Sequence, residues 1–228
     1  MSYSLNRTTI LAYIIRKECI MVRIIAGEYK GCNLFIPPAS NKIRPTSDRV
    51  KESIFSTLRP YISGATVLDL FCGSGNLGLE ALSEGACRCY FVEKDAKCIE
   101  FLKRNIEKMR LNDRAHILAC DVYAGVISLS RKSSPCTIVF ADPPYDRTST
   151  YFAGRRNLLI QLIENDIVAP LTIFVLEHSV SFILPDELLN FEEVRTKRYG
   201  ATAVTMLRCN REGVSKNETE TTAGGISG

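Results

Sequence analysis

"TVLDLFCGSGNLGLEA", residues 66–81, joins an apolar run to a glycine-rich turn and then to a helical pattern. A continuous apolar run of this length is typical of a parallel strand that is buried on both faces of a sheet. Gly73, Gly75 and Gly78 have the spacing G-x-G-x-x-G, which permits a tight turn and close approach of a ligand to the backbone. The stretch therefore predicts the first strand and helix of an open α/β sheet. The glycines alone are compatible with a ligand site or with a turn that only packs the helix on the strand.

Similar apolar runs follow along the chain and alternate with helical patterns. Within residues 96–110, for example, Ile99, Leu102 and Ile106 fall on one face of a helix. Strands that are joined by helical crossovers pair in parallel. The sequence therefore predicts a doubly wound, mostly parallel α/β sheet of the Rossmann-like kind. Its further strands are expected at residues 89–93, 116–120, 137–141 and 172–177.

The region before the sheet, residues 21–60, has a different pattern. It reads as a hairpin with strands at 22–26 and 33–36, followed by a helix at 48–59. Residues 1–60 hold ten of the 29 Lys and Arg residues but only four of the 25 Asp and Glu residues. This asymmetry favours a polyanionic partner, although a solvated basic face is the alternative. The candidate cations for binding such a polyanion are Arg23, Lys30, Arg44 and Arg49.

The sheet domain is expected to span residues 61–209 and to end in an antiparallel hairpin over residues 191–209. Residues 1–20 read as a disordered extension or a misassigned start, because Met21 directly precedes the regular pattern. Residues 210–228 are almost free of apolar side chains, which predicts a disordered tail.

Composition narrows the class of protein. The chain has 228 residues, 46% of them hydrophobic and 24% charged, as in an ordinary globular protein. Its nine cysteines form neither a disulfide framework nor a CxxC pattern, and only two histidines are available, so we expect reduced thiols, a cytoplasmic location and no metal site. The apolar run at residues 10–15 is too short to span a bilayer, so no membrane association is expected.

Open α/β sheets bind ligands at the carboxyl ends of their strands, and acidic residues stand at two of these ends. Glu93 ends the second strand, twenty residues after Gly73, where its carboxylate can accept hydrogen bonds from ribose hydroxyls. Asp121 ends the third strand and is equally suited to cap the helix that follows. Together with the glycines, these residues indicate a dinucleotide or S-adenosylmethionine.

The motif "ADPPY", residues 141–145, distinguishes these two cofactors. An amine that is conjugated to a ring is a poor nucleophile until an acceptor holds its N–H groups and localises the lone pair. Asp142 and the carbonyl of Pro143 can be these acceptors, while the prolines stiffen the loop and Tyr145 can stack on a flat base. A nicotinamide enzyme needs none of this, so the motif favours methylation of a planar amine.

The runs "VRIIAGEYKG", "RPTSDRVKESIFSTL", "VLDLFCGSGNLGLEALSEGA", "VEKD" and "FADPPY" together resemble the RsmD family of 16S ribosomal RNA guanine-N2 methyltransferases. The resemblance covers residues 21–209 and implies a class I methyltransferase fold. It also implies that small-subunit ribosomal RNA is the substrate. A small catalytic domain has little surface for reading sequence, so we expect an assembled or partly assembled subunit to be the form that is methylated, and we expect the protein to be a monomer. The extension and the tail have no counterpart in the family pattern.

The resemblance also implies roles for individual residues. The target guanine would contact Asp142, Pro143 and Tyr145, and Arg44, Thr46 and Arg49 would belong to a cap that packs over the cofactor and meets RNA. S-adenosylmethionine would be bound by Asp69, Phe71, Gly73, Gly75, Glu93, Asp121 and Thr46.

Four other functions remain open at this point. An adenine-N6 methyltransferase shares the chemistry of "DPPY" but usually carries a larger target-recognition region. A protein glutamine methyltransferase prefers Asn at position 142 and does not need a basic N-terminal region. A nicotinamide oxidoreductase gives Asp142 and Tyr145 no role. An RNA-binding module without catalysis leaves the acids at the strand ends unexplained.

Overall fold

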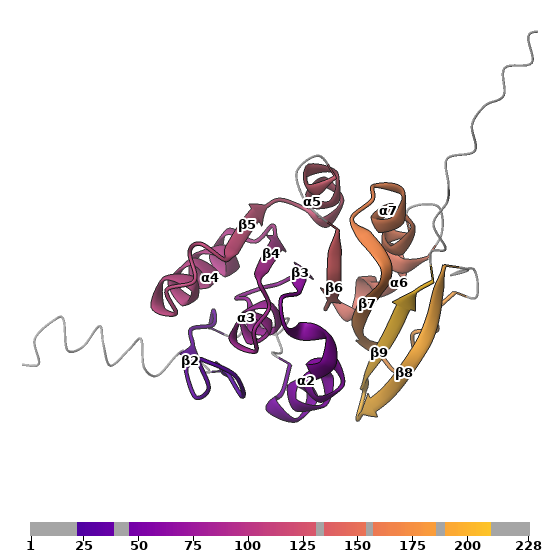
Figure 1. Ribbon diagram of the computed structural model, residues 1–228. Coiled ribbons are helices and arrows are strands. Elements are labelled where there is room, and N and C mark those ends of the chain that lie inside the picture. The colour runs from indigo at the N-terminus through magenta and orange to yellow at the C-terminus, as the bar shows by residue number, and fades with distance from the viewer. Residues whose placement is uncertain (1–21, 39–45, 131–134, 154–156, 186–189, 211–228) are drawn as a thin grey trace, which may run out of the picture.

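The computed structural model of the chain, shown in Figure 1, describes residues 22–38, 46–130, 135–153, 157–185 and 190–210. The predicted extension at residues 1–20, Arg44 and all of the predicted tail except Asn210 lie outside the described residues. No described helix is long and apolar enough to cross a bilayer.

The described part of the chain is built around a seven-stranded sheet with the order β5-β4-β3-β6-β7-β9-β8. The first five strands in this order are parallel, whereas β9 runs antiparallel to both β7 and β8. The predicted mostly parallel sheet and the predicted C-terminal hairpin are both confirmed. The strands are β3 (Thr66–Leu70), β4 (Arg88–Glu93), β5 (Ala115–Ala119), β6 (Cys136–Ala141), β7 (Val168–Ser179), β8 (Phe191–Tyr199) and β9 (Thr202–Cys209).

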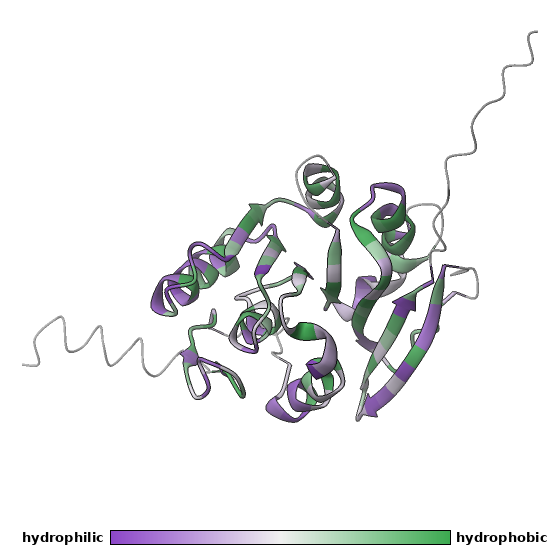
Figure 2. Cartoon of the chain, viewed as in Figure 1, coloured by the Kyte–Doolittle hydropathy of each residue, from purple (hydrophilic) through white to green (hydrophobic). Residues whose placement is uncertain are grey.

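Helices cover both faces of this sheet. Alternate residues of β3 serve the two cores, because Val67 packs with one cluster and Leu68 and Leu70 pack with the other. Burial on both faces explains why the strand is apolar without alternation, and Figure 2 shows the same pattern in the other central strands. The first core contains α2 (Asp48–Ile62), α3 (Asn76–Ser83) and α4 (Ala96–Lys108), and the second contains α5 (Val122–Leu129), α6 (Thr148–Phe152) and α7 (Leu158–Glu164).

The N-terminal hairpin is present but shorter than expected. Its strands are β1 (Val22–Arg23) and β2 (Asn33–Leu34), which pair antiparallel. Helix α2 begins after the N-cap Ser47 and continues three residues beyond the predicted end at residue 59. The predicted end was wrong because the helix continues through Pro60, although proline donates no backbone hydrogen bond there, and buries Ile62 in the core.

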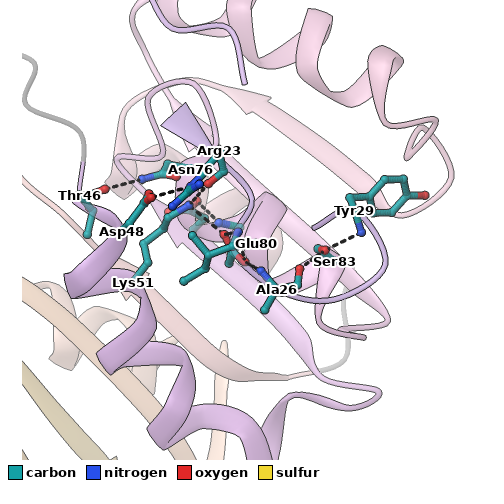
Figure 3. Close-up of polar contacts among 12 residues, drawn as sticks. Arg23, Ala26, Tyr29, Thr46, Asp48, Lys51, Asn76, Glu80 and Ser83 are labelled. Atoms are coloured by element: carbon teal, nitrogen blue, oxygen red, sulfur yellow. Dashed lines mark hydrogen bonds and ion pairs between the residues drawn. The ribbon is translucent and has the colours of Figure 1, made fainter. Parts of the chain in front are cut away.

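A fully buried ion pair joins this N-terminal region to the sheet domain (Figure 3). The Nζ atom of Lys51 in α2 lies 2.8 Å from Oε2 of Glu80 in α3 and donates a second hydrogen bond to the carbonyl oxygen of Arg23. The Glu80 carboxylate also accepts the backbone N–H groups of Ile25 and Ala26. The pair therefore ties the hairpin, α2 and α3 together at one point.

Asn105 of α4 connects the hairpin to the glycine-rich turn. Its side-chain amide donates to the carbonyl oxygens of Phe35 and Ser74 at 2.9 and 3.0 Å, and its oxygen accepts the N–H of Phe35 at 2.8 Å. Because Asn105 is completely buried, these three bonds fix the path of the turn relative to the N-terminal region.

Candidate active site

Five neighbouring parallel strands end at one edge of the sheet, and each brings an acidic residue there. Asp69 lies in β3, next to β6, where the order of the strands reverses. Ligands bind at such a switch point in open α/β sheets. The other acids, in spatial order from β5 to β7, are Asp121, Glu93, Asp142 and Glu177.

The glycine-rich turn is shaped both for ligand access and for packing. Gly73 has φ of +55°, and a Cβ atom added to it would meet no heavy atom within 4 Å, so its backbone faces open space. Gly78 is different, because an added Cβ would lie 2.4 Å from the ring of Phe91 in β4. The first glycine therefore leaves room for a ligand, whereas Gly78 packs α3 against the sheet.

Glu93 is held rigidly beside this turn. Its carboxylate accepts the N–H of Gly73 at 2.9 Å through Oε2 and the N–H groups of Lys94 and Asp95 at 2.8 Å through Oε1. A carboxylate offers about four acceptor positions, so the position that remains is on Oε2. The side chain is thus oriented before any ligand arrives.

Asp121 caps α5, as the alternative interpretation of its sequence position predicts. Its Oδ1 atom accepts the N–H groups of Tyr123 and Ala124 at 3.0 and 3.2 Å. The residue is exposed, and no described donor contacts its Oδ2 atom. A helix cap and a ligand contact are therefore compatible at this position.

Asp69 is an almost fully buried carboxyl group, with 2% of its surface exposed. Burial raises its pKa to about 7, the hydrogen bond from the N–H of Gly78 opposes this shift, and the charge of Glu93 adds to it. An acid whose pKa is raised by folding stabilises the folded state fully below the unfolded pKa, and this stability is lost as the pH rises through the folded pKa.

We expect the ligand-free protein to lose stability between about pH 4 and pH 7, because the unfolded state ionises Asp69 first. Asp69→Asn keeps an oxygen for the Gly78 amide and removes this titration. The unfolding free energy of the variant, measured by urea denaturation, should therefore rise relative to wild type by up to about 1 kcal/mol per pH unit across this range. Asp113→Asn, at an exposed position, is the control. Its unfolding free energy should change with pH in the same way as that of wild type. If the unfolding free energy of Asp69→Asn also changed with pH in the same way as that of wild type, the raised pKa of Asp69 would be contradicted.

The motif at residues 141–145 leaves the sheet at the end of β6. Asp142 is half-buried, and its pKa is raised well above the ordinary value by burial and by the charges of Glu177 and Asp69. Pro143 is buried and directly precedes the exposed Pro144. The acid and the proline carbonyl therefore stand where β3 and β6 lie side by side.

Glu177, two residues before the end of β7, is a candidate site residue that sequence reasoning missed. Its Oε1 atom accepts a hydrogen bond from the hydroxyl of Tyr145, and its Oε2 atom accepts one from Thr46, both at 3.0 Å. The pKa of the buried Glu177 is raised by desolvation, and these two hydrogen bonds act in the opposite direction. Its place at the carboxyl end of the predicted fifth strand was the available signal.

Tyr145 is held by hydrogen bonds at its hydroxyl group, and its ring is exposed. The hydroxyl lies 2.8 Å from that of Thr202 in β9 and bonds to Glu177, while 43% of the residue remains exposed. Burial raises its pKa, a direction that keeps the phenol neutral. The neutral ring is therefore held in one place with surface available for stacking.

The sequence profile of the family described as "Conserved hypothetical protein 95" matches residues 22–208. Ribosomal RNA small subunit methyltransferase D of Escherichia coli (strain K12) is 35% identical over 196 residues, which cover 85% of this chain and 93% of that protein. The chain belongs to the RsmD family. The resemblance of its motifs to this family is thereby confirmed.

Two solved structures are similar in fold to this member of the RsmD family. The Escherichia coli protein yhhF has a TM-score of 0.70 and 30% identity, with 84% of this chain and 99% of that chain covered. An RNA methyltransferase from Salinibacter ruber in complex with S-adenosyl-L-homocysteine has a TM-score of 0.55 and 17% identity, and covers 75% of this chain and 97% of its own. The sheet order and these likenesses show the class I methyltransferase fold.

The N-terminal region of this RsmD family chain reaches the site through Thr46. Its hydroxyl donates to Glu177, and its carbonyl oxygen accepts the side-chain amide of Asn76 at 3.2 Å, beside the glycine turn. The Oδ1 atom of Asn76 is buried and has no hydrogen-bond partner among the described residues. Such an atom needs a donor, so it supports a polar ligand or water at the start of α3.

The remaining predicted residues occupy different surroundings. Phe71 has a positive φ of 59° and packs edge-on against Tyr151, with ring centroids 4.7 Å apart. Arg23 forms an exposed ion pair with Asp48 at 2.7 Å, and Lys30 and Arg49 are exposed. The described residues contain no group of three or more His, Cys, Asp or Glu side chains arranged to hold a metal, and their cysteines are free thiols.

Proposed function

We propose that this chain transfers a methyl group from S-adenosylmethionine to the exocyclic N2 amine of a guanine in 16S ribosomal RNA. The observation that carries this proposal is Asp142 at the end of β6, beside a tyrosine ring that Glu177 and Thr202 hold in place. The similarity to ribosomal RNA small subunit methyltransferase D supports methyl transfer to small-subunit ribosomal RNA. Such a substrate places the protein in the cytoplasm.

The residues at the switch point fit S-adenosylmethionine. Gly73 leaves its backbone open, Glu93 keeps an acceptor position on Oε2 for a ribose hydroxyl, and the Oδ1 atom of Asn76 needs a donor. The raised pKa of Asp69 shows that burial disfavours its negative charge, and a cationic ligand offsets this penalty. When bound, the cofactor supplies an electrophilic methyl group on a cationic sulfur.

Asp142 and Pro143 act on the amine, according to this proposal. Asp142 and the carbonyl oxygen of Pro143 accept its two N–H groups, which directs the nitrogen lone pair away from the ring. Tyr145 stacks on the base and fixes its plane. Orientation of this kind can contribute about 7–11 kcal/mol to lowering a barrier. Asp142 or solvent accepts the proton that the methylated nitrogen releases.

The substrate would be the assembled or partly assembled small subunit. A small catalytic domain has little surface for reading RNA sequence, so it depends on a shape that the subunit presents. The target nucleotide must leave its stack to reach Asp142, which costs a few kcal/mol that phosphate and stacking contacts offset. Arg23, Lys30, Arg44 and Arg49 are the proposed phosphate contacts, and we propose that the protein acts as a monomer.

Glu93→Ala should weaken S-adenosylmethionine binding by about 1.5–3 kcal/mol, the scale of hydrogen bonds to a charged group. Isothermal titration calorimetry measures this loss, and thermal melting without ligand checks that the variant is folded. Glu100→Ala, at an exposed position of α4, is the matched control and should bind like wild type. Tight binding of NAD by the wild type, with no response to S-adenosylmethionine or S-adenosylhomocysteine, would overturn the cofactor assignment.

A further inference from the structure

A hollow of about 360 Å³ lies between α2 and the end of β8, outside the site described above. Three cations, Arg49, Lys197 and Arg198, line it together with Ser53 and Tyr199. A narrower extension of the same surface is lined by Arg195, Thr57 and Met206, among others. We propose that the cations of β8, with Arg49, bind the phosphate backbone of the RNA strand that flanks the target nucleotide.

The charges on this surface are available to a ligand. Lys197 donates to the hydroxyl of Ser53 at 2.7 Å, and Arg195 reaches the hydroxyl of Thr57 at 3.5 Å. None of the four cations forms an ion pair with a described residue. No acidic side chain among the described residues lines the hollow. A polyanion therefore meets uncompensated positive charge here.

Hydrogen bonds to α2 orient β8 for this role. The bonds from Lys197 and Arg195 join the outermost strand of the sheet to a helix that is distant in sequence. In Figure 2 the exposed strand β8 carries hydrophilic residues, in contrast to the central strands. The hollow between helix and strand is concave, a shape that suits a strand of nucleic acid better than a flat membrane.

Both walls of the hollow begin at the proposed target site. Tyr199 at the end of β8 pairs with Thr202, whose hydroxyl contacts Tyr145. On the other wall, Arg49 lies three residues after Thr46, which bonds to Glu177. An RNA strand that places its base on Tyr145 can therefore continue directly into the basic hollow. This inference rests on the proposed RNA substrate and adds a path for its backbone.

The double variant Arg195→Gln/Arg198→Gln tests this path, because both side chains are exposed and Lys197 keeps its bond to Ser53. The control is Lys97→Gln/Lys103→Gln, which removes two exposed charges from α4. Binding of a short fluorescein-labelled single-stranded RNA is measured by anisotropy at several salt concentrations. We expect the double variant to bind RNA about tenfold more weakly at low salt. The slope of the logarithm of the binding constant against the logarithm of salt concentration should be shallower by about 0.7–0.9 for each phosphate that the variant no longer neutralises.

Calorimetry with S-adenosylhomocysteine and methyl transfer to small ribosomal subunits are measured on the same samples. Normal cofactor affinity, with weaker RNA binding and a shallower slope than the control, supports the inference. RNA affinity and slope equal to those of the control overturn it, and the proposed function stands if the wild type still methylates subunits. A wild type that binds RNA but transfers no methyl group overturns the proposed function alone.

Discussion

Asp142→Ala is expected to lower the rate of methyl transfer by about 100-fold or more, the scale seen when one preorganised polar group is removed from an active site. Asp142 is proposed to hold the amine of the target base and not the cofactor. Its loss should therefore leave the affinity for S-adenosylmethionine within a few-fold of wild type. Single-turnover assays measure the rate, and calorimetry measures the affinity.

Two features of the site make this test sharp. Removing a half-buried carboxyl group that Glu177 and Asp69 repel should not unfold the protein, because its ionised form is disfavoured there. Asp146→Ala is the matched control, since Asp146 is an exposed acid four positions further along the same loop. Equal single-turnover rates for Asp142→Ala and wild type would remove Asp142 from the mechanism.

The largest expected effect on stability is at the buried ion pair. Lys51→Met should lower the free energy of unfolding by about 3–5 kcal/mol, because it leaves the Glu80 carboxylate buried without its cationic partner. Lys51→Met/Glu80→Gln should recover part of this loss, since an uncharged amide oxygen can still accept the backbone N–H groups of Ile25 and Ala26. Urea denaturation, with comparison of slopes as well as midpoints, measures both variants.

Arg23→Gln is the control for this prediction. It removes an ion pair whose side chains are 63% and 44% exposed, and exposed pairs contribute about 1 kcal/mol or less. A loss for Lys51→Met no larger than that for Arg23→Gln would contradict the view that the buried pair anchors the N-terminal region.

The sequence alone was sufficient to predict the strands of the sheet and most of the acids at their carboxyl ends. Runs of apolar residues with helical spacers define a parallel sheet, and an acid after such a run is placed at the carboxyl edge by the chain direction alone. Glu93 and Asp142 could be found in this way because each is local to its strand. The same logic applies to Glu177, which was overlooked although it ends a predicted strand.

Contacts between distant segments could not be predicted in this way. Thr46 and Glu177 are 131 positions apart, and nothing in their local patterns indicates that they meet. The pairing of Lys51 with Glu80 is equally hidden, because Lys51 lies in an amphipathic helix, where a charge usually faces water, and nothing local indicates its partner in the buried helix α3. The basic hollow could not be predicted from the charge pattern. Its β8 cations lie in residues 61–228, which have no net positive charge, and only the fold brings them next to Arg49.

The identity of the methylated nucleoside tests the proposed function most directly. Small ribosomal subunits from a strain that lacks the homologous enzyme are incubated with the protein and labelled S-adenosylmethionine, digested to nucleosides and analysed by mass spectrometry. We expect N2-methylguanosine, formed by wild type and strongly reduced with Asp142→Ala, and better yields from subunits than from naked RNA. Label in N6-methyladenosine or in a protein band, with none in N2-methylguanosine, would contradict the proposed function.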